Sequence, residues 1–252
     1  MRKHVITFWL CLVAMIFGPV AAAHAGLIVV RTMGDPMGTQ TVKQTYYMEG
    51  ARFAIIGEDG NGQIFDADRQ LAWTYNTHLK TYTKINRAQA EAARAQMNAF
   101  AEQMKHMPPD VRKRMEAADA ARSAGPTLKR MGKEKSVRQW RCTPVAGYMA
   151  GRDEPVMTMC VASFSELGMT ASDIKLMHHI QKMADKLTVM SSASGQRMEA
   201  GLKKIGLDGM PVEIQRANGG KIDVLSVSHG AIPSGVFELP KGLHEQSLPM
   251  FQ

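Results

Sequence analysis

The sequence predicts an α+β fold in which one antiparallel β-sheet wraps over helices. Three features support this prediction. Residues 27–85 contain short runs of alternating polar and apolar side chains, broken about every 8 to 12 residues by turn residues, which is typical of an antiparallel meander. Residues 86–124 shift abruptly to Ala, Arg, Gln, Glu and Met without any Gly, and this composition favours helices. After Gly125 the strand pattern returns.

The composition is that of a globular protein. Of 252 residues, 45% are hydrophobic and 21% are charged, which excludes a disordered or collagen-like chain. The beginning of the chain has the form of a secretory signal peptide: a basic start at Arg2 and Lys3, an apolar run of residues 5–17, and a small-residue cleavage site at residues 23–25. This run is shorter than the roughly 20 residues that span a bilayer.

We therefore expect residues 1–25 to be a signal peptide that is cleaved after Ala25. The remaining residues, 26–252, are expected to form a single domain with a helical insertion over residues 87–124. An exported protein without a lipid-accepting cysteine after its cleavage site fits the bacterial periplasm. A retained membrane anchor is the alternative.

Export bears on the three cysteines. Cleavage removes Cys11 and leaves Cys142 and Cys160 in an oxidising compartment, where a pair is expected to bond. A hairpin that turns around Gly151 places these two residues directly opposite each other, at a separation that suits a disulfide. Spacing and compartment thus both predict a bond between Cys142 and Cys160.

The predicted hairpins bring aromatic and aliphatic side chains together. A two-residue loop at Glu49-Gly50 sets Tyr46 opposite Phe53 and Gln44 opposite Ile55. A four-residue loop over residues 76–79 sets Trp73 opposite Tyr82. Near the end of the chain, a three-residue loop at Asn218-Gly219-Gly220 sets Ile214 opposite Val224.

Two helical regions carry apolar stripes. In the first, one face holds side chains that step by three and four residues, and Pro108 then ends the helix and starts another. These side chains are Ala90, Ala93, Met97, Phe100, Met104 and Met107. The second helix opens with a capping box at Thr170 and Asp173, and its inward stripe includes Met177.

Several segments resemble an uncharacterised bacterial family, domain of unknown function 4412. The resemblance rests on Gly62–Ile85 (GQIFDADRQLAWTYNTHLKTYTKI), Trp140–Tyr148 (WRCTPVAGY), Cys160–Leu176 (CVASFSELGMTASDIKL), Gly209–Ile214 (GMPVEI) and Ile232–Gly242 (IPSGVFELPKG). It covers residues 27–86 and 125–243. That family is grouped with the periplasmic lipoprotein carriers LolA and LolB, whose fold is an incomplete barrel of curved antiparallel sheet with helices on its concave side.

The resemblance implies a LolA-like curved sheet, with the Met-rich helical hairpin as an insertion, whose concave face admits an acyl chain or another apolar group. It supplies no residue roles, so we assign the apolar lining from the hairpins and stripes. The expected lining residues are Tyr46, Phe53, Ile55, Trp73, Tyr82, Met97, Phe100, Met104 and Met177. A pocket of roughly 300 Å³ or more lined by them would favour a carrier, and a filled interior would disfavour it.

Catalytic and metal-binding signatures are weak. The chain lacks G-x-S-x-G and C-x-x-C, so we expect neither an enzyme nor a cofactor. Thioether sulfur atoms can bind copper, and two sets of residues are candidates for this: Met104, His106 and Met107, or Met157, Met159 and Cys160. Helical spacing separates the first set and strand alternation separates the second, so core packing or an adaptable apolar surface explains the methionines better.

Basic residues gather in one stretch that contains Lys129, Arg130, Lys133 and Lys135. Either they form an edge that faces anionic lipid head groups, or they are solvated strand and turn positions. We expect no nucleic-acid partner. The sequence therefore favours a periplasmic carrier of an apolar ligand such as a lipid or lipoprotein acyl group. The alternative is an envelope structural or interaction protein with a filled core, and copper handling by methionines is third.

Overall fold

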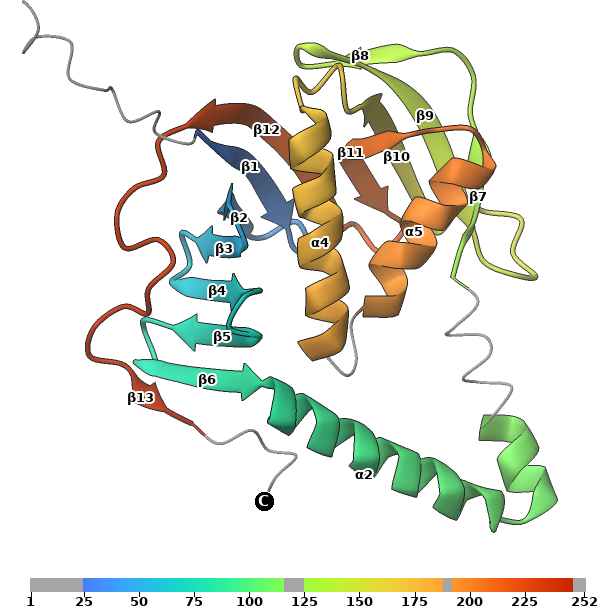
Figure 1. Cartoon of the computed structure of the whole chain (residues 1–252). Coiled ribbons are helices and arrows are strands. Elements are labelled where there is room, and N and C mark those ends of the chain that lie inside the picture. Colours follow the sequence, from blue (N-terminus) through green and yellow to red (C-terminus); the bar gives the residue numbers. More distant parts are fainter. Residues whose placement is uncertain (1–24, 116–124, 188–191, 247–252) are drawn as a thin grey trace, which may run out of the picture.

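The computed structural model describes residues 25–115, 125–187 and 192–246. It confirms an α+β fold built on a large curved sheet that does not close into a barrel (Figure 1). The described residues form thirteen strands, and the order across the sheet is β13-β6-β5-β4-β3-β2-β1-β12-β11-β10-β9-β7, with β8 paired to β9 outside this path. The short β13 runs parallel to β6. The sheet is therefore mixed, whereas the sequence predicts an antiparallel one.

The predicted strands are present, with ends that differ by a few residues. The first six are β1 (Gly26–Gly34), β2 (Thr41–Glu49), β3 (Arg52–Gly57), β4 (Asn61–Asp66), β5 (Leu71–Asn76) and β6 (Thr81–Asn86). The others are β7 (Thr127–Arg130), β8 (Lys135–Val137), β9 (Trp140–Tyr148), β10 (Met157–Ser163), β11 (Gly209–Arg216), β12 (Lys221–Gly230) and β13 (His244–Glu245). The pairing of β1 with β12 joins the first strand to the last hairpin.

Three helices accompany the sheet: α2 (Arg87–Lys105), α4 (Ala171–Leu187) and α5 (Ser192–Lys204). A further helical stretch, residues 109–115, follows α2. The sequence pattern does not predict α5. The predicted signal peptide lies outside the described residues except for Ala25, and so does the end of the predicted insertion. No described helix is long and apolar enough to cross a membrane.

Each predicted hairpin register differs from the observed one by two residues. Tyr46 pairs with Ile55 instead of Phe53, because the first loop is Gly50-Ala51 with a positive φ at Gly50. Trp73 pairs with Lys84 instead of Tyr82. In the last hairpin, Ile214 pairs with Ile222 instead of Val224. A two-residue shift keeps every side chain on its face of the sheet, so the face assignments within each hairpin survive.

The predicted capping box begins α4. The Thr170 hydroxyl accepts a hydrogen bond from the Asp173 backbone N–H at 3.3 Å, and the Asp173 carboxylate accepts one from the Thr170 backbone N–H at 2.6 Å. His229 Nε2 lies 2.9 Å from the same carboxylate. Burial raises the pKa of Asp173, but the hydrogen bonds from Thr170 and His229 outweigh it and hold the pKa below its ordinary value. This contact ties the start of α4 to β12.

The concave side of the sheet holds α4 and α5, as Figure 1 shows. Side chains of α4 such as Met177 and Ile180 pack over the centre of the sheet, on Leu27, Val29 and Met48 among others. Met183 and Leu187, near the other end of α4, pack against Phe65 and Ala72. The second helix, α5, covers β7, β9 and β10 through Leu202 and Met198.

The other face of β3 to β6 is also covered. The segment that follows β12, residues 231–243, crosses this face and packs Val236, Phe237 and Leu239 against Ile64 and Tyr75. Arg52 stacks on the ring of Phe237, with its guanidinium carbon 4.5 Å from the ring centroid. Strands β3 to β5 therefore carry packed side chains on both faces.

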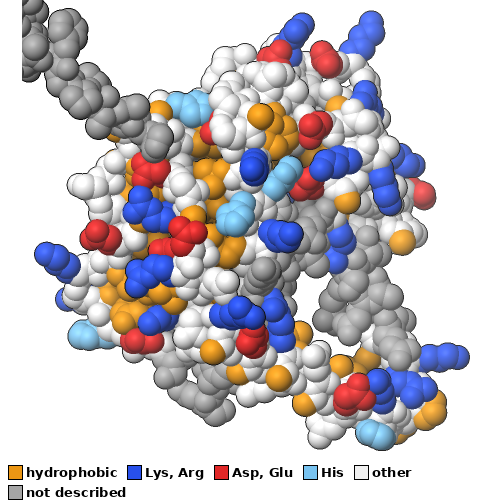
Figure 2. All heavy atoms as spheres, in the orientation of Figure 1, with side chains coloured by type: hydrophobic (Ala, Val, Ile, Leu, Met, Phe, Trp, Pro, Cys, Tyr) orange, Lys and Arg blue, Asp and Glu red, His pale blue; other side chains and the backbone are white. Residues whose placement is uncertain are grey.

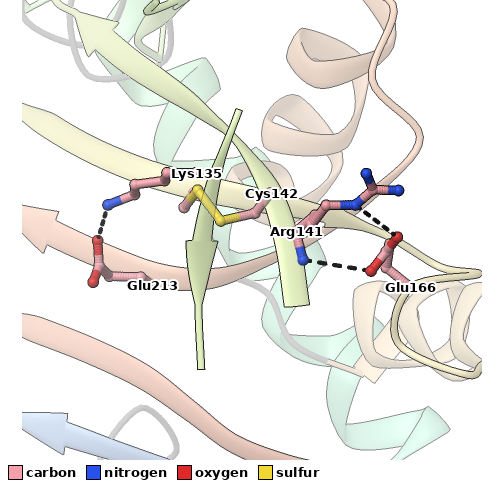
Figure 3. Close-up of a disulfide and its surroundings, with 6 residues drawn as sticks. Lys135, Arg141, Cys142, Glu166 and Glu213 are labelled. Carbon is pink, nitrogen blue, oxygen red and sulfur yellow. Dashed lines mark hydrogen bonds and ion pairs between the residues drawn. A yellow bond between two sulfur atoms is a disulfide. The ribbon is translucent and has the colours of Figure 1, made fainter. Parts of the chain in front are cut away.

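The predicted disulfide is present between Cys142 and Cys160, with their Cα atoms 5.4 Å apart. The residue paired with Cys160 is Pro144, so the bond links diagonal neighbours of β9 and β10 rather than directly opposed residues. Figure 3 shows it flanked by two ion pairs, Lys135 with Glu213 at 2.9 Å and Arg141 with Glu166 at 3.6 Å. The two cysteine side chains are almost completely buried.

Candidate functional site

The predicted lining residues separate into three groups. The first group lies on the concave face and consists of Tyr46, Phe53 and Ile55 from β2 and β3, with Met177 from α4 beside them. Tyr46 and Ile55 are direct cross-strand partners. The Tyr46 and Phe53 ring centroids are 5.8 Å apart, close enough for a favourable aromatic contact. All four side chains are only partly buried.

The second group, Trp73 and Tyr82, lies on the opposite face of the sheet. Both pack against the cluster that contains Tyr75 and Val236, under residues 231–243. The Tyr82 hydroxyl donates a hydrogen bond to Glu245 at 3.1 Å. These two aromatic residues therefore do not join the first group, and they hold the C-terminal segment instead.

The third group, Met97, Phe100 and Met104, lies on α2. This helix packs against the body of the protein only through its first turns, where Ala90 and Ala93 are buried. Beyond them it extends away from the sheet (Figure 1). Phe100 is 58% exposed and Met97 is 47% exposed. The apolar stripe predicted for this helix exists, but in its second half Met97 and Phe100 are exposed and Met104 is only partly buried.

The concave group continues into an aromatic row formed by Tyr46, Phe53 and Phe65 from three neighbouring strands. The second step of the row, from Phe53 to Phe65, is 5.7 Å between ring centroids. Phe53 contacts both of the main clusters beneath α4, so it connects the centre of the sheet with the end near β4 and β5. Figure 2 shows hydrophobic side chains at the surface between α4 and these strands.

A half-buried arginine closes one end of the row. Arg31 donates two hydrogen bonds to the Gln44 side-chain oxygen, at 3.2 and 3.0 Å, and stacks on Tyr46 with its guanidinium carbon 4.4 Å from the ring centroid. Burial, and to a lesser extent the nearby Arg216, lowers the pKa of Arg31 to about 10. Arg31 consequently keeps its charge at neutral pH and gives this end of the row a polar boundary.

A pocket of about 350 Å³ lies at the other end, between α2, α4 and the turn that joins β4 to β5. Its apolar lining is Ala67, Met183 and Leu187, and the last two belong to the cluster that holds Phe65. Its polar lining is Gln70, Arg87, Glu91, Arg94, His179 and Lys182. None of the predicted lining residues borders this pocket. Sequence reasoning missed it because its two helices are far apart in the chain.

The structure offers little for metal binding or catalysis. The described residues contain no group of three or more His, Cys, Asp or Glu side chains that suits a metal ion. Cys160 is bonded to Cys142, and Met157 and Met159 pack in the separate cluster beneath α5. The Thr170 hydroxyl donates a hydrogen bond to the Asp173 carboxylate and not to an imidazole. This contact therefore caps a helix and does not resemble a nucleophile paired with a histidine base.

The basic residues near β7 and β8 make several contacts within the chain. Arg130 donates to the backbone carbonyls of Ile205 and Gly206 at 2.8 and 2.7 Å. Lys135 pairs with Glu213, and the Lys129 ammonium lies 5.1 Å from the centroid of the Tyr148 ring. Lys133 is exposed. These contacts give three of the four basic side chains a role within the fold.

Comparisons with known proteins identify no family for this chain. No family model matches it, and no curated protein matches it. Among solved structures, two crystal forms of PNGF-II align with 88% and 90% of the chain, at 7% and 8% sequence identity and TM-scores of 0.35 and 0.36. The chain spans about a third of the length of those proteins, since the alignments cover 31% and 32% of them.

Proposed function

We propose that this protein is an exported, non-enzymatic module that binds an apolar ligand, such as a lipid or a lipoprotein acyl group, on the concave face of a LolA-like sheet in the periplasm. One observation carries the proposal: Tyr46 and Phe53 form an aromatic pair beside α4 that is only partly buried, and the buried Phe65 continues it. A disulfide between two buried cysteines agrees with an oxidising compartment.

This binding mode differs from an enclosed cavity. Phe65 is buried against Met183 and Leu187 of α4, so the ligand would lie on the partly buried side chains of β2 and β3 beside that helix. A partly exposed aromatic surface suits a carrier, because the ligand is covered enough to leave water and open enough to be passed on. Met177 beside the row adds an adaptable side chain.

Two neighbouring residues of β3 test the proposal. Ile55 lies on the concave face and Ile56 packs in the cluster under residues 231–243. With a fluorescent fatty acid as the probe, we expect saturable binding to the unchanged protein. The variant Ile55→Thr should bind it at least about fourfold more weakly, since a hydroxyl replaces the ethyl branch of the side chain and each lost methylene of contact is worth about 0.8 kcal/mol.

The variant Ile56→Thr is the matched control, because it makes the same chemical change one residue away on the other face. It should bind the probe as the unchanged protein does, and thermal unfolding of the two variants establishes that both are folded. Absence of saturable binding by the unchanged protein, or equal losses in both variants, would count against the concave site.

An envelope interaction protein is the second candidate, and the exposed stripe of α2 favours it. Met97, Phe100 and Met104 of α2, and Met107 just after its end, recur at steps of three, four and three residues, the spacing of a seam between paired helices. In that case crosslinking in the native envelope should capture one dominant protein through α2, and the purified complex should contain no lipid.

A further inference from the structure

We infer that Arg31 binds the carboxylate of a fatty acid whose tail lies over the aromatic pair of Tyr46 and Phe53. The inference rests on the proposed function and adds the chemical class of the ligand and the residue that recognises its head group. It depends on a positive charge that the fold leaves without a counter-ion, on an open space next to that charge, and on its direct contact with the aromatic pair.

The positive charge of Arg31 is held by neutral groups. Its guanidinium donates two hydrogen bonds to the side-chain oxygen of Gln44 and stacks on the ring of Tyr46. No carboxylate of the described residues lies within ion-pair distance of it. Charges that are withdrawn from water in folded proteins are usually paired. Arg31 is partly buried, so its attraction for an anion is one that the described fold does not satisfy.

The nearest charge that acts on Arg31 is a second arginine. Burial, and to a lesser extent Arg216, lowers the pKa of Arg31 to about 10. Arg216 is exposed at the end of β11, and it too has no carboxylate within ion-pair distance among the described residues. An anion bound at Arg31 offsets the repulsion between the two guanidinium groups.

The Arg31 guanidinium also has donors to spare. Its bonds to Gln44 use two of the five N–H groups that a guanidinium carries. The others can donate charge-assisted hydrogen bonds to a carboxylate, which are stronger than bonds between neutral groups. Arg31 can therefore bind a head group without giving up the contacts that hold it in place.

A pocket of about 240 Å³ gives a head group room at this end of the sheet. Gln44 and Arg216, the hydrogen-bond partner and the charged neighbour of Arg31, both line it. It is smaller than the roughly 300 to 1,000 Å³ of sites that enclose a whole small molecule, so it suits a head group alone. Asp35 and Asp59 also line it, each hydrogen-bonded within its own turn. Their charges disfavour a doubly charged phosphate and leave a singly charged carboxylate as the better fit.

The tail of the fatty acid has a direct path from Arg31 onto the apolar surface. The guanidinium carbon of Arg31 is 4.4 Å from the centroid of the Tyr46 ring, and that ring is 5.8 Å from Phe53. Ile55 pairs with Tyr46 across β2 and β3, and Met177 of α4 lies beside them. These four apolar side chains are all only partly buried, so a tail covers them without displacing a packed core.

The test compares lauric acid with lauryl alcohol as competitors of a fluorescent fatty acid bound to the purified protein. The two competitors have the same tail and differ in the charge of the head group. At neutral pH and low salt, we expect the acid to bind about tenfold more tightly than the alcohol. The variant Arg31→Met should reduce this preference to less than about twofold and leave the affinity for the alcohol unchanged, since methionine keeps an apolar stem over Tyr46.

A second variant keeps the test decisive if Arg31→Met does not fold. Arg216 is exposed, so Arg216→Gln is expected to fold normally. It should reduce the preference for the acid about threefold, because it removes the second positive charge at the head group. An unchanged preference in Arg216→Gln together with an unfolded Arg31→Met would count against the inference.

Arg52→Met is the matched control. Arg52 also stacks on an aromatic ring, that of Phe237, but on the opposite face of the sheet. It should keep the full preference for the acid, and a loss equal to that of Arg31→Met would contradict the assignment. Equal binding of acid and alcohol by the unchanged protein overturns the head-group assignment while the proposed function stands. If neither competes, the proposed function itself fails. If acetate competes as well as lauric acid, Arg31 holds a small anion and the fatty acid is excluded.

Discussion

Replacing Cys142 and Cys160 together with alanine is expected to lower the free energy of unfolding by about 3 to 5 kcal/mol. The bond joins residues separated by 18 positions. Cross-linking a loop of that length lowers the entropy of the unfolded chain and so stabilises the folded state by about 3 kcal/mol. The two side chains are 2% and 0% exposed within the central cluster, so their removal also loosens packing. Urea unfolding of the oxidised protein and of the double variant measures the difference.

The single variant Cys142→Ala separates the two contributions to this loss. It breaks the cross-link but leaves the Cys160 side chain in the core, so it should account for most of the destabilisation. A double variant within 1 kcal/mol of the unchanged protein would mean that the bond contributes little to the stability of the fold.

Two phenylalanines should respond very differently to truncation. Phe65 is 8% exposed and packs against Met183 and Leu187, whereas Phe100 is 58% exposed on the free part of α2. We expect Phe65→Ala to lower the free energy of unfolding by about 3 to 5 kcal/mol and Phe100→Ala to change it by less than about 0.5 kcal/mol. Chemical denaturation of both variants under the same conditions provides the comparison.

The Phe100→Ala result also bears on the role of α2. A loss above 2 kcal/mol in the isolated protein would show that the helix packs back onto the body of the chain. The expected near-neutral value instead means that the stripe is free to contact another molecule.

Local pattern was sufficient to predict the capping box of α4, the disulfide and the strands other than the short β8 and β13. Each predicted hairpin register was wrong by two residues, because the turn can begin at any of several neighbouring residues. For example, Glu49 stays in β2 and pairs with Arg52 at 2.6 Å, which moves the loop to Gly50-Ala51. Because the shift is even, the inward and outward sets of side chains are unchanged.

The assignment of faces between hairpins could not be made from the sequence. Strand β3 places Phe53 and Ile55 on one face and Ala54 and Ile56 on the other, and both faces are apolar. Alternation alone does not say which face is concave. Trp73 consequently joined the predicted lining although it lies beneath the C-terminal segment.

The pocket escaped sequence reasoning for a related reason. Arg87 begins α2 and Lys182 lies near the end of α4, and only the packing of α2 against α4 brings them together. For the apolar stripe of α2, the pattern was visible in the sequence but its surroundings were not. Its spacing predicted an apolar face correctly, but the sequence carried no signal that the helix would leave the sheet after Ala93.

Photo-crosslinking with a fatty acid that carries a diazirine in its tail tests the central claim most directly. Peptide mapping should find saturable adducts on β2 and β3, at or beside Tyr46, Phe53 and Ile55, and on the facing side of α4, with competition by unlabelled fatty acid. Saturable labelling confined to α2 between Met97 and Met104, or to the outer face near Trp73, would contradict the account. So would labelling that unlabelled fatty acid does not displace.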